Sequence, residues 1–378
     1  MRPVDAAAPE RNPDKRVEPL ELFFDLVFVF ALTQVTARMA EELSWGGLLR
    51  GGLVLAAIWW AWAAYSWLTN EVDCRRRVVR LVIFAAMICM LIASLAVPKA
   101  FEGDAVIFAV AYLGVRVLHV GLFAAASDDL DVRAAARALA PTAVLAPALL
   151  LIASGLDDAL QMATWIVALA IDYVGGARRG ISGWRLSPGH FAERYSLIVI
   201  IAIGESIVAI GVGAGKTALG GLELLCAALG VILAACLWSD YFDEDLERVE
   251  HQLAGLGRAD RNALARDAFP FLHLPLVAGI VLVALGVKQT LAHTHADLEI
   301  VAALALCGGT ALFLLANAAF RHRVLRQRSP ARLAAAATCL ALTALAVSTP
   351  AYVTLLAVVA AAMTLVAFES RPRGTRPA

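Results

Sequence analysis

Twelve apolar stretches, each close to 20 residues long, constrain this chain more than any other feature of its sequence. A helix needs about 20 mostly apolar residues to cross a bilayer core about 30 Å thick. The predicted spans are 20–39, 51–69, 79–97, 105–126, 135–154, 159–176, 195–214, 220–241, 268–288, 298–320, 332–349 and 350–368. Only Ser348, Thr349 and Pro350 separate the last two, so one long kinked helix over 332–368 is an alternative. The sequence predicts an all-α, polytopic membrane helix bundle of about 12 transmembrane helices.

The composition supports this class. Hydrophobic residues make up 61% of the 378 residues and charged residues 17%, whereas soluble domains average about 45–50% and about 25%. The net charge is zero, so no basic surface indicates nucleic acid, and the expected partner is the lipid bilayer. The six cysteines form no CxxC pair, and we interpret them as packing residues. We predict no cofactor and no metal site, because His293, His295 and Asp297 offer only three ligands in a short loop.

Lys and Arg are concentrated on one side of the predicted spans. Cytoplasmic loops are enriched in these residues, and here the even-numbered connections and both tails are the basic ones. The exceptions on the other side are Arg38, Arg50, Lys99, Lys216 and Lys288, while Arg116 falls within a span. We therefore expect both termini in the cytoplasm and an even number of spans.

A weak similarity links the two halves of the chain at a shift of about 171 residues. Glu193-Arg-Tyr opens span seven as Glu21-Leu-Phe opens span one. Such halves would be parallel six-helix repeats with a site at their interface, unless hydrophobic helices merely resemble one another. The predicted division is a flexible cytoplasmic tail over 1–16, a first half over 17–176, a cytoplasmic connection over 177–194, a second half over 195–368 and a cytoplasmic tail over 369–378.

Three acids begin the first span, in VEPLELFFDLVFVFALTQVT at 17–36. Glu18, Glu21 and Asp25 fall on one helical face, because spacings of three and seven return to the same side. A charged side chain near the bilayer interior costs about 2.5–3.5 kcal/mol on insertion scales. Asp25 is therefore expected to face other helices or a wet cavity.

A second polar stripe is predicted on span seven, in HFAERYSLIVIIAIGESIVAIG at 190–211. His190, Arg194 and Glu205 lie near one helical face, and Ser206 follows Glu205. Burial without a partner favours a neutral, protonated Glu205, which is suited to proton exchange. The alternative is an interhelical hydrogen bond that only holds span seven to a neighbour.

Arg116 and His119 lie midway along span four, three residues apart and therefore adjacent on a helix. Arginine does not lose its charge by losing a proton, so Arg116 needs a carboxylate partner. The candidates are Glu205, Asp25 and Asp172 of span six. Arg116 either contacts a substrate or anion, or forms a structural pair.

Three further features have ordinary interpretations. His273 lies between two prolines of span nine, and we expect a hydrogen-bonded core residue. We interpret the aromatic residues of span two as an aromatic belt with interhelical packing, with a pocket wall as the alternative; they are Trp59, Trp60, Trp62, Tyr65 and Trp67. The acidic run over 240–250 is expected to form a solvated amphipathic helix on the membrane surface.

The segments at 20–36 and 190–211 are more specific than hydropathy. LELFFDLVFVFALTQVT and HFAERYSLIVIIAIGESIVAIG together resemble the bacterial low temperature requirement protein A (LtrA) family, over roughly residues 17–370. The resemblance implies a multi-pass protein of a bacterial cytoplasmic (inner) membrane, named for a connection with growth in the cold. It implies no settled biochemical activity and no catalytic residues.

The sequence favours two functions. The first is a secondary transporter of a small molecule or proton, in which Asp25 and Glu205 titrate and Arg116 balances charge. The second is a non-transporting scaffold or lipid-acting protein of cold or envelope stress tolerance, although no nucleophile and base share a motif that indicates an enzyme. The candidate transport or polar-core residues are Glu21, Asp25, Arg116, His119, Asp172, Glu193, Arg194, Glu205, Ser206 and His273. Their convergence on a cavity would favour transport, and isolated pairs would favour a scaffold.

Overall fold

The computed structural model describes residues 16–126, 130–178, 186–215, 220–242 and 246–370, which form helices and connecting turns. The helices of the first part are α1 (Pro19–Glu41), α2 (Trp45–Glu71), α3 (Arg77–Ala96), α4 (Ala105–Ala126), α5 (Leu130–Ala153) and α6 (Asp158–Arg178). Those of the second part are α7 (Pro188–Ala214), α8 (Gly221–Phe242), α9 (Leu246–Ala254), α10 (Arg258–Ala292), α11 (Ile300–Ala303), α12 (Gly309–Leu325), α13 (Pro330–Ala346) and α14 (Ala351–Glu369). A 3-10 turn at Val97–Lys99 follows α3, and a π-helical turn at Leu304–Gly308 joins α11 to α12.

The predicted spans are confirmed in number and order within the described ranges. Eleven helical segments are long and apolar enough to cross a membrane, and α13 is a shorter apolar helix. The 332–368 region forms two helices, so the single kinked helix is wrong there. The chain turns between α13 and α14, where hydrogen bonds to the loop before α11 fix the path of the backbone. Leu298 N–H donates to Ala346 O, and Ala351 N–H donates to Ala296 O.

Two helices begin well before their predicted limits. The helix α7 begins at Pro188, so His190 and Arg194 belong to a span rather than to the predicted connection 177–194. Proline at the first helical position explains this start. The N–H groups of the first turn have no acceptor within the helix, so the N–H that proline lacks costs no hydrogen bond there. The helix α10 has 35 residues, about 52 Å at 1.5 Å per residue, and therefore extends beyond the bilayer core. The predicted tails lie largely outside the described residues.

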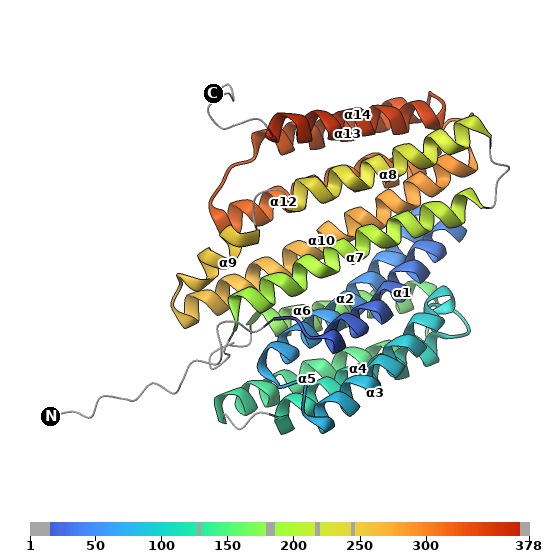
Figure 1. Cartoon of the computed structure of the whole chain (residues 1–378). Coiled ribbons are helices and arrows are strands. Elements are labelled where there is room, and N and C mark those ends of the chain that lie inside the picture. Colours follow the sequence, from blue (N-terminus) through green and yellow to red (C-terminus); the bar gives the residue numbers. More distant parts are fainter. Residues whose placement is uncertain (1–15, 127–129, 179–185, 216–219, 243–245, 371–378) are drawn as a thin grey trace.

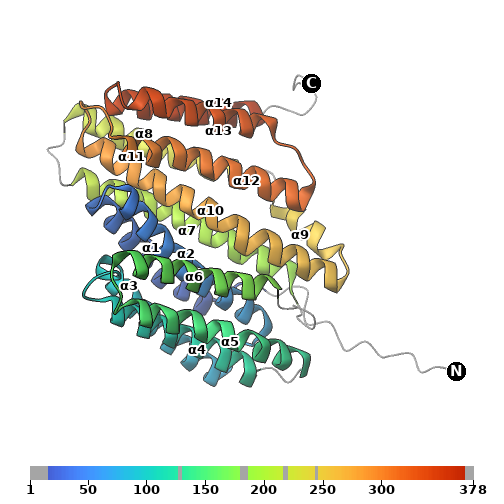
Figure 2. The ribbon, with the colours of Figure 1, turned by 180° about the vertical axis from the view of Figure 1, so that it is seen from behind.

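Helix contacts follow the same order in both parts of the chain. In the first part α1 contacts α2 and α3, and the chain of contacts continues from α3 to α4, α5 and α6, with α2 against α6. In the second part α7 contacts α8 and α10, and the chain continues from α10 to α12, α13 and α14, with α8 against α14. Figures 1 and 2 show α3, α4 and α5 at one edge and α13 and α14 at the opposite edge, with α1, α2, α7 and α10 between them.

Glycine permits a close approach between α10 and the segment formed by the π-helical turn and the start of α12. A Cβ at Gly286 would lie 2.5 Å from Leu306 Cα, and one at Gly279 would lie 2.8 Å from Gly309 O. Any larger residue would push the two backbones apart, as in other small-residue contacts between membrane helices. Elsewhere apolar side chains point outward, among them Leu81, Ile88 and Leu95 of α3, as expected of a lipid-facing surface.

The acidic run departs from its predicted structure. Asp240 belongs to the end of α8 and is buried, so a fully solvated run is wrong. It lies there because Arg332 of α13, at 2.8 Å, and Asn317 of α12, at 2.7 Å, surround its carboxylate. Residues 243–245 of the run lie outside the described residues. The short helix α9 carries Glu247 and Glu250 and packs its buried Val249 and Leu253 against α7 and α12.

Candidate functional site

One group of polar side chains joins α1 to α7 in the interior of the bundle. His190 Nε2 lies 2.9 Å from Glu21 Oε2, and Arg194 Nη1 donates to Asp25 Oδ2 at 2.7 Å. The indole N–H of Trp62, on α2, donates to Asp25 Oδ1 at 2.8 Å. These five residues, here called the interface cluster, are each at most 1% exposed. The stripes predicted on spans one and seven therefore face each other.

The residues of the interface cluster also make longer contacts with one another. Four of their buried polar atoms have no hydrogen-bond partner among the described residues, namely Glu21 Oε1, His190 Nδ1, Arg194 Nε and Arg194 Nη2. Arg194 Nε lies 3.7 Å from Glu21 Oε1, and its guanidinium lies 5.6 Å from the centre of the Trp62 ring. The contacting residues are four apart on both helices, in the same direction, so α1 and α7 run parallel. A parallel pair is expected between halves that each have six spans.

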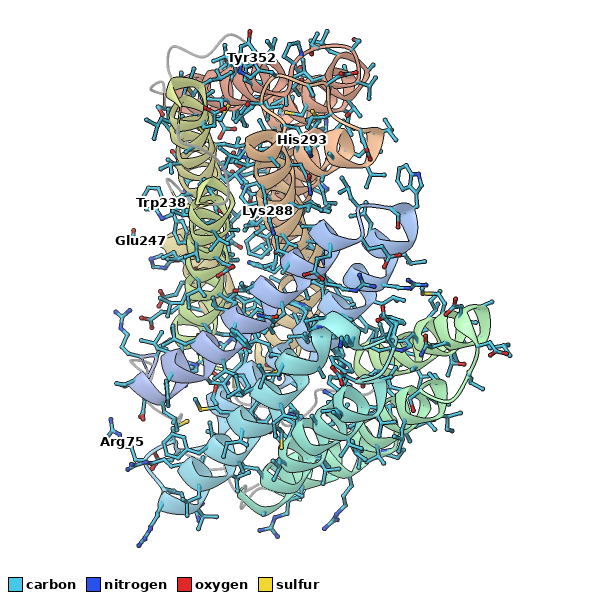
Figure 3. All side chains as sticks on the ribbon, turned by 90° about the vertical axis from the view of Figure 1, so that its right-hand side faces the viewer. Arg75, Trp238, Glu247, Lys288, His293 and Tyr352 are labelled. Carbon is cyan, nitrogen blue, oxygen red and sulfur yellow. The ribbon has the colours of Figure 1, made fainter. Side chains whose placement is uncertain are left out.

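Glu18 does not join the other two acids. It precedes α1 and forms a capping box with Glu21, in which the Glu18 N–H donates to Glu21 Oε2 at 2.9 Å. Its own carboxylate accepts from Arg75 at 3.2 Å. Arg75 projects away from the helices at the bend between α2 and α3 (Figure 3). The expectation that all three acids share one helical face is therefore wrong, because Glu18 is the N-cap residue and lies outside the helix.

A second ion pair connects α4 to α6. Arg116 Nη2 donates to Asp172 Oδ1 at 2.6 Å, so among the three predicted partners the structure selects Asp172. Both side chains are nearly fully buried, at 5% and 1% exposure. His119 is one turn further along α4, beside the backbone of Ala64 and 5.5 Å from the Tyr65 ring.

This pair borders a cavity, here called the membrane cavity. Its volume is about 690 Å³, including the open space at its mouth. The polar lining residues are Arg116, His119, Asp172, Thr142 and Arg266, and the apolar ones are Trp60, Ala63, Ala64, Trp67, Leu139, Ala143, Gly176 and Pro270. No residue of the interface cluster is among them. The pocket-wall interpretation of the span-two aromatics therefore holds for Trp60 and Trp67, while Trp59, Trp62 and Tyr65 pack in the interior rather than in a belt at the bilayer surface.

The floor of the membrane cavity, formed by Arg116, His119 and Asp172, has hydrogen-bonding groups without partners. Arg116 Nε and Nη1 and both ring nitrogens of His119 have no hydrogen-bond partner among the described residues. Asp172 Oδ2 also accepts no hydrogen bond of good geometry, although Trp60 and Tyr112 lie beside the carboxylate. Buried polar groups normally have partners. Unused donors and an unused acceptor beside a cavity form a surface that a polar ligand can bind.

The remaining predicted site residues lie elsewhere. Glu205 is buried on α7 beside Thr33 of α1, away from the membrane cavity lining, and the Ser206 hydroxyl donates to Ile203 O at 2.6 Å. Glu193 accepts from the Val17 N–H at 3.2 Å. The four residues Asp25, Arg116, Asp172 and Glu205 therefore do not converge on one site, which by the criterion set from the sequence favours a scaffold. Of the four, Arg116 and Asp172 border a cavity.

His273 has the hydrogen bonds of a core residue. Its Nδ1 lies 3.1 Å from Phe269 O and its Nε2 lies 2.8 Å from the Tyr241 hydroxyl. Because a carbonyl only accepts, Nδ1 donates to Phe269 O, and the tyrosine hydroxyl is the partner of Nε2. His273 therefore connects α10 to α8 as a hydrogen-bonded core residue, as the ordinary interpretation predicts.

Sequence reasoning missed a second cavity between α8, α12, α13 and α14. Its volume is about 670 Å³, including open space, and Asp240, Arg321, Arg332 and Glu369 are among its lining residues. Arg332 lies 2.6 Å from Glu369 and 2.8 Å from Asp240. Arg332 is the first residue of the predicted span 332–349, and nothing in its local sequence indicates that it pairs with Asp240 of α8. The buried pair with Asp240 is a property of the tertiary fold.

These features define a polytopic α-helical membrane protein with ion pairs buried inside its bundle. Residues 16–367 match the family described as Bacterial low temperature requirement A protein (LtrA), and the chain belongs to that family. It is similar to the uncharacterized protein RA0937 of Rhizobium meliloti (strain 1021), with 32% identity over 314 residues, which are 78% of this chain and 74% of that protein. No solved structure matches the chain. The resemblance at 20–36 and 190–211 is thereby confirmed.

Proposed function

We propose that this protein is a secondary transporter of a small solute and that the membrane cavity is its substrate site. The observation that carries the proposal is Arg116, a buried arginine whose Nε and Nη1 have no acceptor beside an open volume. Such a charge within a membrane span is costly. The unused donors of Arg116 border a volume that a ligand can enter, whereas those of Arg194 border neither described cavity. An exchangeable ligand would satisfy the donors of Arg116.

The helix contacts support two parallel halves, 17–176 and 195–368, as repeats of one unit. Contacts recur in the same order in both parts, and α1 runs parallel to α7. The membrane cavity lies mostly in the first half, but α10 of the second half contributes Arg266 and Pro270 to its lining. Rocking of one half against the other would therefore change the shape of the cavity, as alternating access requires.

The distribution of Lys and Arg supports a bacterial inner membrane location with both termini in the cytoplasm. With that orientation the cavity residues Leu139, Gly176 and Arg266 lie near the cytoplasmic ends of α5, α6 and α10. Arg116 and Asp172 then lie at the deeper end of the membrane cavity. The conformation described here is therefore assigned to a state open toward the cytoplasm.

The test is solute-induced charge movement or flux in proteoliposomes with an imposed pH gradient. We expect at least one class of small solute to give a signal with the wild-type protein and none with Arg116→Gln. The matched control is Arg50→Gln, since Arg50 pairs with Glu42 away from the membrane cavity. Equal signals from Arg116→Gln and the wild type would remove the cavity from the transport path. No signal for any solute that stabilises the wild type would reject transport.

One observation favours the second function, a non-transporting scaffold. Charges in the interface cluster and around Asp240 are paired with one another, as in a bundle held together by polar contacts. A scaffold predicts that Arg116→Gln, if folded, restores low-temperature growth to a deletion strain as well as the wild-type gene does. A transporter predicts that it fails to restore any growth defect that the wild type corrects.

A further inference from the structure

We infer that the membrane cavity binds a small organic monocarboxylate on Arg116 and that binding brings one proton onto Asp172. This inference rests on the cavity being the substrate site, and it assigns both the chemical class of the ligand and the coupling proton. It moves the titrating role away from Asp25, which is held by both Arg194 and Trp62.

The guanidinium of Arg116 has room for a carboxylate while Asp172 is still bound. Asp172 takes one hydrogen of Nη2, and that nitrogen carries two, one on each edge of the planar group. One complete edge, formed by Nη2 with either Nε or Nη1, is therefore free in the described structure. Carboxylates bind such an edge through two parallel hydrogen bonds, a geometry that a lysine or a lone histidine does not offer.

The charge balance at the floor then requires a proton. Arg116 and Asp172 neutralise each other at the buried floor. At the partly exposed rim, Arg266 and Arg323 share the carboxylate of Asp267, at 2.7 and 2.9 Å, so the rim carries one net positive charge that solvent screens. A bound carboxylate would add a second negative charge beside the same guanidinium, in a site of low dielectric. Two carboxylates this close do not both remain ionised, and one shared proton restores neutrality.

Asp172 is the group that takes up the proton, because its protonation ends the competition between the two carboxylates for Arg116. Protonated Asp172 no longer draws Arg116 away from the ligand, whereas a proton on His119 would leave both carboxylates competing for it. The titratable or charged groups that face Asp172 or share its cavity are Arg116, Tyr112 and His119 of α4, Tyr65 of α2 and Arg266 of α10. The cavity residues of α5, namely Leu139, Thr142 and Ala143, carry no charge. The binding of one ligand in the cavity is thus linked to the uptake of one proton by Asp172, and its release to the loss of that proton.

The side chains of the cavity walls indicate the chemical character of the rest of the ligand. Trp60, Trp67, Leu139 and several alanines surround the floor, so the carboxylate should carry a compact apolar group. A dicarboxylate would need a second cation. Among the described lining residues the other arginine, Arg266, lies at the rim rather than at the floor, and there it shares Asp267 with Arg323. Benzoate and butyrate are suitable probes, and benzamide is the neutral isostere of benzoate.

The test is calorimetric titration of benzoate into the detergent-purified, full-length protein in buffers of different ionisation enthalpy. We expect uptake of about one proton per benzoate bound, and no binding of benzamide. Asp172→Asn should still bind benzoate with proton uptake near zero, and His119→Gln should retain uptake near one. Arg116→Gln should lose at least about tenfold in affinity, because the bidentate pair is gone.

The wild-type measurement decides the proposal even if a variant fails to fold. Binding of benzoate or butyrate without proton uptake overturns the coupling, and uptake lost in His119→Gln but kept in Asp172→Asn assigns the proton to the histidine instead. Absence of binding by both probes overturns the ligand class. Carboxylate binding with proton uptake but without flux in proteoliposomes would reject only transport, and flux of another solute without carboxylate binding would reject only this inference.

Discussion

The Arg194–Asp25 and Arg116–Asp172 pairs are both buried in the same bundle, yet their surroundings differ. Arg194 lies among Glu21, Asp25 and Trp62, and no residue of that cluster borders either described cavity. Arg116 and Arg194 each have two side-chain nitrogens without a hydrogen-bond partner among the described residues, but only Arg116 has an open volume beside it. The difference indicates that a buried charge marks a binding site only when hydrogen bonds are left unmade beside accessible space. The first pair joins α1 to α7, and the second borders the cavity that we propose as the ligand site.

The largest effect should come from removing the interface cluster's cation. Arg194→Gln leaves Glu21 and Asp25 buried without a full counter-charge, and breaking such a pair costs about 3–5 kcal/mol. Unfolding in detergent, followed by tryptophan fluorescence, would measure the loss. Arg50→Gln is the control, since its partly exposed pair, with side chains 25% and 29% exposed, should contribute about 1 kcal/mol or less. A loss as small as that of the control would contradict a structural role for the cluster.

A smaller effect should follow from removing one neutral donor. Trp62→Phe keeps most of the ring contacts with Trp59 and Tyr195 but leaves Asp25 Oδ1 without its indole partner. A buried acceptor left unsatisfied costs about 1–3 kcal/mol. The same unfolding measurement applies, with Trp238→Phe as the matched control, because Trp238 is largely exposed on α8 (Figure 3). Equal losses in both variants would mean that the Asp25 hydrogen bond contributes nothing.

Arg116→Gln should destabilise the protein less than Arg194→Gln does. Asp172 would be left beside a cavity that water can enter, so we expect a loss of about 1–2 kcal/mol, between the values of exposed and fully buried pairs. Comparing the two variants in one unfolding experiment sharpens the distinction between the regions. If Arg116→Gln proved as costly as Arg194→Gln, the cavity pair would be a second structural clamp.

The smallest effect on stability should come from filling the membrane cavity. Ala143 lies in its wall, and Ala143→Leu adds apolar volume there without touching a charge. We expect a change of stability within about 1 kcal/mol, since cavity-filling substitutions are usually neutral or favourable. Benzoate affinity should nevertheless fall by at least about tenfold, measured by the same calorimetry. Unchanged affinity would place the ligand outside this cavity.

The spans could be predicted because bilayer thickness fixes the length of an apolar helix. The predicted helix limits were wrong where packing, rather than hydropathy, decides where a helix begins. Pro188 starts α7 within a polar stretch, and Arg258 starts α10 well before the apolar run. The turn between α13 and α14 depends on hydrogen bonds from the loop before α11, which no local pattern encodes.

The candidate residues could be predicted one by one, but not their partners. Helical periodicity predicted the faces that carry Glu21 and Asp25 on one span and His190 and Arg194 on another. It did not indicate that these faces meet, or that Arg116 would select Asp172 over Glu205. The Asp240–Arg332 pair was missed for the same reason, because both residues come from ends of helices distant in sequence.

The accessibility of the two regions to water can be measured directly, in a background whose six native cysteines are replaced. Thr142→Cys lies in the membrane cavity wall, and Ser66→Cys is a near-isosteric change beside Tyr195, next to the interface cluster. We expect a water-soluble anionic methanethiosulfonate reagent to modify Thr142→Cys readily, with protection by benzoate, and to leave Ser66→Cys unmodified in the folded protein. Equal modification of both positions, or of neither, would contradict the division into a closed cluster and an open site.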